Sequence, residues 1–80
     1  MTLANAVSKR IRKILNDKKM TQYRLEQNAG ISHSTMNSFL NARYKACNLT
    51  TVVLIVSALG MTIAEFFDNP IFENEDLIVE

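Results

Sequence analysis

The chain has 80 residues with one cysteine and one histidine, which excludes an internal disulfide and a zinc site built from several such ligands. Residues 1–45 contain nine basic and two acidic side chains, a formal charge of +7, whereas residues 46–80 contain six acidic and no basic ones, a charge of −6. This asymmetry, hidden in a net charge of +1, favours a polyanionic partner, although two oppositely charged solvated faces are the alternative.

The first residues enter a helical pattern without the apolar core of an export signal. The longest apolar-rich stretch, residues 49–61, contains two threonines and a serine and is too short to cross a bilayer. A lone thiol also suits a reducing compartment. We therefore expect a single cytoplasmic domain without membrane contact.

Five helices are predicted from apolar residues at three- and four-residue spacing and from the residues at their borders. They span about residues 3–18, 22–28, 32–41, 48–59 and 63–67. Thr21, Ser32 and Thr62 are the expected N-caps of the second, third and fifth helices. Gly30 and Gly60 are expected to end the second and fourth helices.

The fourth helix, expected to start at Asn48 or Thr50, is rich in β-branched residues that would also suit a strand. Its length and terminal glycine favour a helix with most of its apolar side chains buried. These side chains are Val52, Val53, Ile55, Val56 and Leu59. We assign residues 1–68 to the domain and residues 69–80 to an acidic and apolar tail, in which 77–79 form either a dimerisation strand or a frayed end.

The most informative stretch, residues 22–39, holds a short helix, a turn at Gly30 and a second helix. Its apolar residues suit two crossing helices that pack on a common core. They are Leu25, Ala29, Ile31, Met36 and Phe39. The glycine supplies the left-handed backbone that a tight turn between helices demands.

This stretch resembles the helix-turn-helix of the Cro/cI-type phage-repressor (XRE) family in the run Met20-Thr21-Gln22, Leu25 and Ala29-Gly30-Ile31-Ser32-His33-Ser34-Thr35-Met36. Residues 10–14 resemble that family's first helix, and residues 59–67 resemble its last turn and fifth helix. The resemblance covers about residues 7–68. It implies an all-α, five-helix domain whose third helix enters the major groove of double-stranded DNA.

Three features depart from the family pattern. Glu26 replaces a small residue next to the recognition helix, so its side chain is expected to bend to solvent or to accept backbone N–H groups. Ala42 replaces the usual glycine, so Asn41 is the expected left-handed cap. Leu15 and Leu40 stand where related repressors often carry an arginine–glutamate pair, which predicts an apolar contact instead.

One face of the third helix, residues 32–41, is uncharged and rich in hydrogen-bonding groups, which suits base edges. The family geometry implies that the base-reading residues are His33, Ser34, Asn37 and Ser38. Asn37 is suited to a bidentate pair with adenine, and His33 is expected to donate to a guanine acceptor. The alternative for this face is ordinary wet surface.

Phosphate contacts are expected around that face, from Gln22, Thr35, Asn41, Arg43, Tyr44 and Lys45. Gln22 begins the second helix, where backbone N–H groups and the helix dipole favour an anion. Weaker candidates are Lys18, Lys19 and Arg24, whereas Lys9, Arg12 and Lys13 are expected on a solvated helix face.

The function predicted from these observations is a transcriptional regulator, a repressor, that binds specific double-stranded DNA sequences as a homodimer. Apolar candidates for the dimer surface are Phe66, Phe67, Ile71, Phe72 and residues 77–79. The alternative is a protein-interaction module, such as an antitoxin or anti-repressor, that uses the acidic tail. Catalysis, a cofactor, a metal or a small-molecule ligand is not expected, since no nucleophile–base set and no glycine-rich phosphate loop is present.

Overall fold

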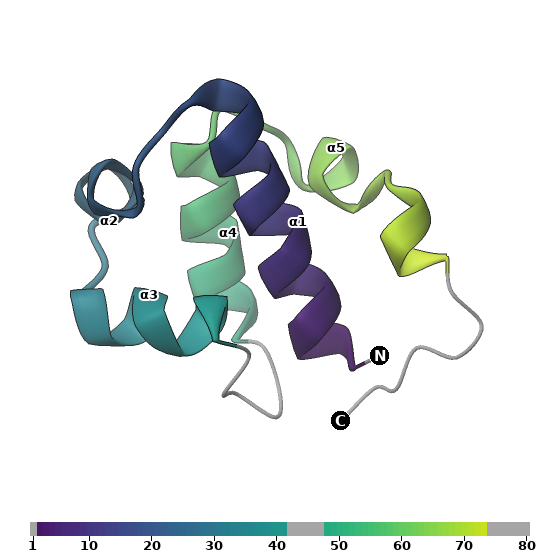
Figure 1. Cartoon of the computed structure of the whole chain (residues 1–80), viewed down its shortest axis with the longest axis horizontal. Helices are drawn as coiled ribbons and strands as arrows, with labels where there is room; N and C mark the ends of the chain where they lie inside the picture. The colour runs from purple at the N-terminus through teal and green to yellow at the C-terminus, as the bar shows by residue number, and fades with distance from the viewer. Residues whose placement is uncertain (1, 42–47, 74–80) are drawn as a thin grey trace.

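The computed structural model describes residues 2–41 and 48–73, which form five α-helices and a short 3-10 helix (Figure 1). They are α1 Leu3–Lys18, α2 Gln22–Ala29, α3 His33–Leu40, α4 Leu49–Ala58, α5 Ile63–Phe67 and the 3-10 helix η1 Pro70–Phe72. The expectation of an all-α domain with five helices is confirmed. The predicted phosphate-contacting residues Arg43, Tyr44 and Lys45 and the predicted strand or frayed end at 77–79 lie outside the described residues.

Side-chain caps set where the helices begin. Thr21, Ser32 and Thr62 each accept a hydrogen bond from the backbone N–H three residues later, at 3.1, 3.1 and 3.0 Å. Asn48 caps α4 in the same way at 3.3 Å, so the fourth helix starts there and not at Thr50. Each cap satisfies one of the N–H groups that the first turn of a helix leaves without a partner.

Three residues with a left-handed backbone conformation stand after the ends of helices α1, α2 and α4. Gly30 and Gly60 have φ values of 67° and 75°, as expected for glycines that follow helices. The prediction of a left-handed Asn41 is wrong, because φ there is −98° and its N–H bonds to the Asn37 carbonyl, which continues the turn. Among the described non-glycine residues, Lys19 alone has a positive φ, 53°, and it ends α1.

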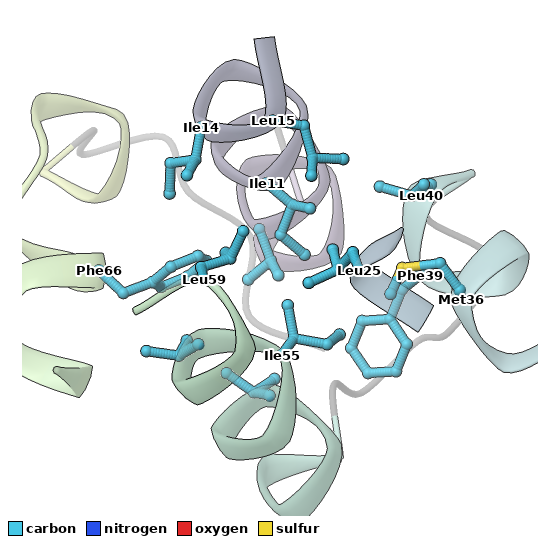
Figure 2. Packing of buried hydrophobic residues seen from close by; sticks show 13 residues of the cluster. Ile11, Ile14, Leu15, Leu25, Met36, Phe39, Leu40, Ile55, Leu59 and Phe66 are labelled. Carbon is cyan, nitrogen blue, oxygen red and sulfur yellow. The ribbon is translucent and has the colours of Figure 1, made fainter. Parts of the chain in front are cut away.

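A single apolar cluster joins all five helices (Figure 2). Its members are Val7, Ile11, Ile14, Leu15, Leu25, Met36, Phe39, Leu40, Val52, Ile55, Val56, Leu59 and Phe66. Leu15 and Leu40 are both buried in it, as their apolar character predicts. The expected burial of α4 is confirmed except at Val53, which is 39 % exposed because α4 packs on one side only. None of the helices in the described part of the chain has the length and hydrophobicity that a membrane crossing needs.

Two arginines of α1 hold the C-terminal ends of other helices. Arg12 donates to the carbonyl of Leu40 at 2.8 Å, and the buried Ser8 hydroxyl donates to the same oxygen at 2.6 Å. Arg10 donates to the carbonyl of Phe66 at 2.8 Å and lies over its ring. Positive charge is favourable at a helix C-terminus, where carbonyl groups lack partners within the helix. These arginines therefore stabilise the fold, so part of the basic charge of the first half has a structural use.

The chain after α5 turns back onto α1. Pro70 begins η1, which packs against α1. The rings of Phe66, Phe67 and Phe72 form a cluster with centroid separations of 4.8–6.0 Å. These three phenylalanines, predicted as candidates for a dimer surface, thus contribute to the packing of their own domain.

A reciprocal capping box begins α5. The Thr62 hydroxyl accepts the N–H of Glu65 at 3.0 Å, and the Glu65 carboxylate accepts the N–H of Thr62 at 2.9 Å. The hydrogen bonds from the backbone and side chain of Thr62, aided by the positive charge of Lys18, outweigh desolvation and lower the pKa of Glu65. The ionised carboxylate is therefore the form that stabilises the folded chain.

We expect acid to weaken this cap. Because the Glu65 pKa is lower in the folded than in the unfolded chain, its contribution is present above the ordinary value of 4.5 and is lost as the pH falls through the folded value. Urea denaturation between pH 7 and 3 should show a smaller acid-induced loss of unfolding free energy in Glu65→Gln than in the wild type. Glu73→Gln, which changes an exposed residue outside the box, is the control. Identical pH profiles for all three proteins would contradict this link.

Candidate nucleic-acid interface

The pair α2 and α3 forms the helix-turn-helix expected from the sequence. Gly30 and the two following residues connect the helices, and the N–H of Gly30 donates to the carbonyl of Glu26 at 2.9 Å. Leu25 on α2 and Met36 on α3 are both fully buried in the common core. This packing fixes how the two helices cross and leaves one side of α3 facing outward.

The four residues predicted to read bases lie on that outer side of α3. His33 and Ser34 are exposed, whereas Asn37 and Ser38 are half-buried on the same face. The opposite side carries the buried Met36, Phe39 and Leu40. Within the described residues, the hydroxyl groups of Ser34 and Ser38 have no hydrogen-bond partner, so both are free to bond to a ligand or to water.

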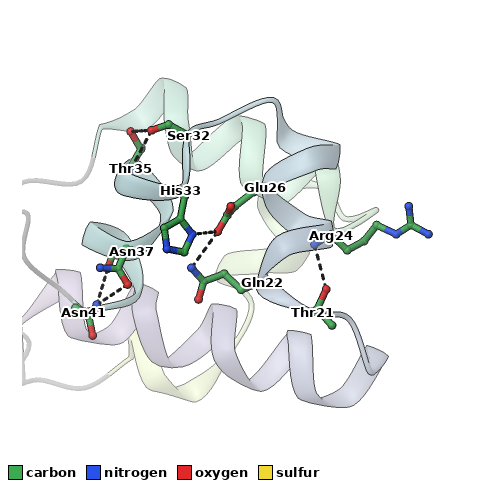
Figure 3. Close-up of polar contacts among 9 residues, drawn as sticks. All are labelled: Thr21, Gln22, Arg24, Glu26, Ser32, His33, Thr35, Asn37 and Asn41. Atoms are coloured by element: carbon green, nitrogen blue, oxygen red, sulfur yellow. Dashed lines mark hydrogen bonds and ion pairs between the residues drawn. The ribbon is translucent and has the colours of Figure 1, made fainter.

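Asn41 orients the side chain of Asn37. The side-chain amide of Asn41 donates to the carbonyl oxygen of Asn37 at 2.8 Å and to its Oδ1 at 3.1 Å (Figure 3). Oδ1 of Asn37 is thereby directed toward Asn41, and its Nδ2 keeps both protons available for donation. Asn41, predicted to contact phosphate, thus also braces a predicted base-reading residue.

A buried carboxylate connects α2 to the first residue of α3. Oε2 of Glu26 accepts a hydrogen bond from Nε2 of Gln22 at 3.0 Å and lies 2.8 Å from Nδ1 of His33 (Figure 3). Glu26 is only 8 % exposed, so the expectation that its side chain bends to solvent is wrong. The alternative, hydrogen bonds from backbone N–H groups, is also wrong, because the carboxylate bonds to the side chains of Gln22 and His33. Burial raises the pKa of Glu26, but the hydrogen bonds from Gln22 and His33 and the charge of His33 outweigh it, and the net shift is downward.

Glu26 is absent from the predicted site residues, although its side chain contacts two of them. The sequence does carry a signal for it. An acidic residue stands where related proteins have a small one, seven positions before the only histidine. Whether those two side chains meet depends on the angle between α2 and α3, which no local pattern specifies.

Gln22 and Thr35, both predicted to contact phosphate, stand at the starts of α2 and α3. The Nε2 of Gln22 is engaged by Glu26, which leaves its side-chain carbonyl and one amide proton. The hydroxyl of Thr35 accepts the Ser32 hydroxyl at 2.9 Å and keeps its own proton for donation. Each residue therefore retains at least one group that can donate to a phosphate oxygen.

Positive charge gathers at the junction of α1 and α2. A shallow hollow of about 300 Å³ is lined there by Lys18, Lys19, Met20, Thr21 and Arg24. It adjoins the first turn of α2, where the helix dipole also favours an anion. The side chain of Arg24 is directed away from α3 (Figure 3). The hollow therefore presents positive charge to solvent at the start of α2.

The chain matches the family model of the Cro/C1-type HTH DNA-binding domain over residues 10–70. No curated protein and no solved structure matches it significantly. The matched range contains the whole of α2, α3, α4 and α5, together with the turn that sets the outer face of α3. The chain therefore belongs to the Cro/C1-type helix-turn-helix DNA-binding domains and is a DNA-binding transcriptional regulator.

Proposed function

We propose that the protein is a repressor that binds a specific double-stranded DNA sequence as a homodimer, with α3 in the major groove. The observation that carries the proposal is the outer face of α3, where four uncharged hydrogen-bonding side chains stand opposite a buried apolar side. Such groups match the donors and acceptors that base pairs display in the major groove. The 3-10 helix η1 lies on the other side of α1 from this face (Figure 1).

The contacts divide into two classes. Base edges are read by His33, Ser34, Asn37 and Ser38. The DNA backbone is held by Gln22, Thr35, Asn41, Arg43, Tyr44 and Lys45. The first set carries no permanent charge, whereas the second includes two permanent cations. This division is the one expected if phosphate contacts position the protein and base contacts give it specificity.

A homodimer follows from the small size of the reading surface. α3 has eight residues, and one copy contacts only a few base pairs. Two copies related by a two-fold axis would read half-sites separated by about 34 Å, one turn of DNA. Occupation of such a site within a promoter would block transcription, which is the basis for assigning a repressor role.

Selection of bound duplexes from a random DNA pool tests the proposal. We expect the enriched sequences to share a two-fold symmetric motif whose half-sites are about one helical turn apart. A motif without symmetry would contradict the homodimer, and a pool without any enrichment would contradict sequence-specific binding. Placement of the selected site between the elements of a reporter promoter then tests repression directly.

Replacement of Arg43 by alanine should weaken binding to all DNA sequences by a similar factor. Loss of one phosphate contact is expected to reduce the slope of log affinity against log salt by about 1 for each bound subunit. Fluorescence anisotropy at several salt concentrations, on the selected duplex and on a random one, measures both quantities. Lys13→Ala is the control, since it removes the same charge from a residue paired with Asp17 on α1. An unchanged slope in Arg43→Ala, or an equal change in both variants, would contradict the assignment.

A further inference from the structure

The contact between Glu26 and His33 constrains the chemistry of the histidine. The imidazole is 76 % exposed, but its Nδ1 lies 2.8 Å from the carboxylate of Glu26, whose side chain is only 9 % exposed. The same oxygen accepts Nε2 of Gln22 at 3.0 Å. One ring nitrogen of His33 is therefore held by the protein, and Nε2 is left for a ligand (Figure 3).

The protonation state of that pair follows from the chemistry of the carboxylate. An ionised carboxylate only accepts hydrogen bonds, so the nitrogen opposite it must carry a proton. Its hydrogen bonds with Gln22 and His33 favour the ionised form of the Glu26 carboxylate. In neutral His33 the proton thus lies on Nδ1, and the exposed Nε2 is a bare acceptor. Only the protonated imidazolium has an N–H at Nε2.

We propose that Glu26 is a positioning residue that makes His33 a pH-dependent base reader, which favours cytosine over guanine when neutral and guanine over cytosine when protonated. Cytosine, like adenine, presents an amino donor in the major groove, whereas guanine presents only the acceptors N7 and O6. The inference rests on the proposed function, since it needs α3 in that groove. It revises the expectation that His33 donates to guanine, which the neutral ring cannot do while Nδ1 holds the proton.

The groups around His33 leave Glu26 as its controlling partner. On α2, Gln22 is uncharged and the side chain of Arg24 is directed away from α3. On α1, which also packs against α3, Arg12 bonds to the carbonyl of Leu40 at the opposite end of α3. Within the described residues, Glu26 is the charged side chain that His33 contacts.

The tautomer of His33 in the free protein is the first test. Long-range ¹H–¹⁵N NMR spectra of the imidazole at pH 8 should show the Nδ1–H form in the wild type. Glu26→Ala, which introduces the small residue usual in the family, should show the Nε2–H form that an unconstrained imidazole prefers. The Nε2–H form in the wild type would overturn the inference. This readout needs no DNA, so it is independent of the proposed function.

Base preference is the second test. The duplex selected at pH 8 is compared with versions that carry each other base at the position His33 reads, by fluorescence anisotropy at pH 5.5 and 8. We expect cytosine to be preferred over guanine by about fivefold or more at pH 8, and guanine over cytosine at pH 5.5. Glu26→Ala should lose the cytosine preference at pH 8, and His33→Gln, which can both donate and accept, should show no inversion.

The outcomes separate the two hypotheses. Sequence-specific binding with the same base preference at both pH values would overturn this inference and leave the proposed function intact. An inversion that persists in His33→Gln would also overturn it, because another group would then titrate. Absence of sequence-specific binding at every pH would overturn the proposed function, and the inference with it, whatever tautomer the free protein shows.

Discussion

Replacement of Asn37 by alanine is expected to cost about 1–3 kcal/mol of binding free energy on the selected DNA sequence and to relax the base preference at one position. The side chain stands on the outer face of α3, where Oδ1 is oriented by Asn41 and Nδ2 remains free to donate. An asparagine in this state accepts from the amino group of adenine and donates to its N7. Affinity measured on the four base variants of that position, at one salt concentration, checks the result.

Asn41→Ala is the matched control for this variant. It removes the hydrogen bonds that orient Asn37 but keeps the atoms that would pair with adenine, so we expect a smaller loss of affinity with the same base preference. Binding to a random duplex should change little in Asn37→Ala. An equal loss on the random and the selected duplex would show that Asn37 supports the DNA backbone contact or the fold, and would contradict base reading.

Local patterns in the sequence predicted most of the fold. The borders of the helices follow from caps that act within four residues, so Thr21, Ser32 and Thr62 could be identified from the chain alone. Gly30 and Gly60 could be identified as the residues that follow helices for a similar reason. The positive φ at each position is a local property that favours glycine. The outward face of α3 follows from helical periodicity, because burial of one side determines the other.

The contacts that the sequence did not reveal join residues far apart in the chain. Arg10 bonds to the carbonyl of Phe66, 56 positions away, and Arg12 to that of Leu40, 28 positions away. On α1 both arginines look like part of a solvated basic face. Their partners are backbone carbonyls at helix ends, which no side-chain pattern marks. The contact of Glu26 with His33 is similar, because it depends on the crossing of two helices.

The backbone at the ends of α1 and α3 was also beyond local reasoning. Lys19 adopts a left-handed conformation, which was expected for Asn41 because Ala42 replaces the family's glycine. A lysine there costs energy relative to glycine, so propensity gives no hint of it. Asn41 stays in a right-handed turn, since its side chain and N–H both bond to Asn37. The N–H of Lys19 bonds to the carbonyl of Asn16 at 3.2 Å, so in each case a specific hydrogen bond accompanies the conformation.

The packing of α5 leads to the prediction with the largest effect on stability. Phe66 is fully buried, its ring lies 5.0 Å from that of Phe67 and 6.0 Å from that of Phe72, and the guanidinium of Arg10 lies 5.7 Å above it. Its backbone carbonyl also accepts a hydrogen bond from Nε of Arg10 at 2.8 Å. The ring of Phe66 thus packs α5 against η1 and α1, so removal of the ring leaves a cavity where these three elements meet.

We expect Phe66→Ala to lower the free energy of unfolding by about 3–5 kcal/mol, a large part of the total of about 5–15 kcal/mol typical of native proteins. The corresponding fall in melting temperature is roughly 12–40 °C for a domain of this size. Phe67→Ala is the matched control, because it deletes the same atoms from a neighbouring half-buried ring and should cost clearly less. Urea denaturation followed by circular dichroism measures both losses, and similar values for the two variants would contradict the central role of Phe66.

Phe66 belongs to α5, whereas the proposed DNA contacts belong to α2, α3 and residues 41–45. The affinity of the folded fraction for DNA should therefore remain that of the wild type. A loss of affinity beyond the unfolded fraction would mean that α5 also supports the DNA-binding surface.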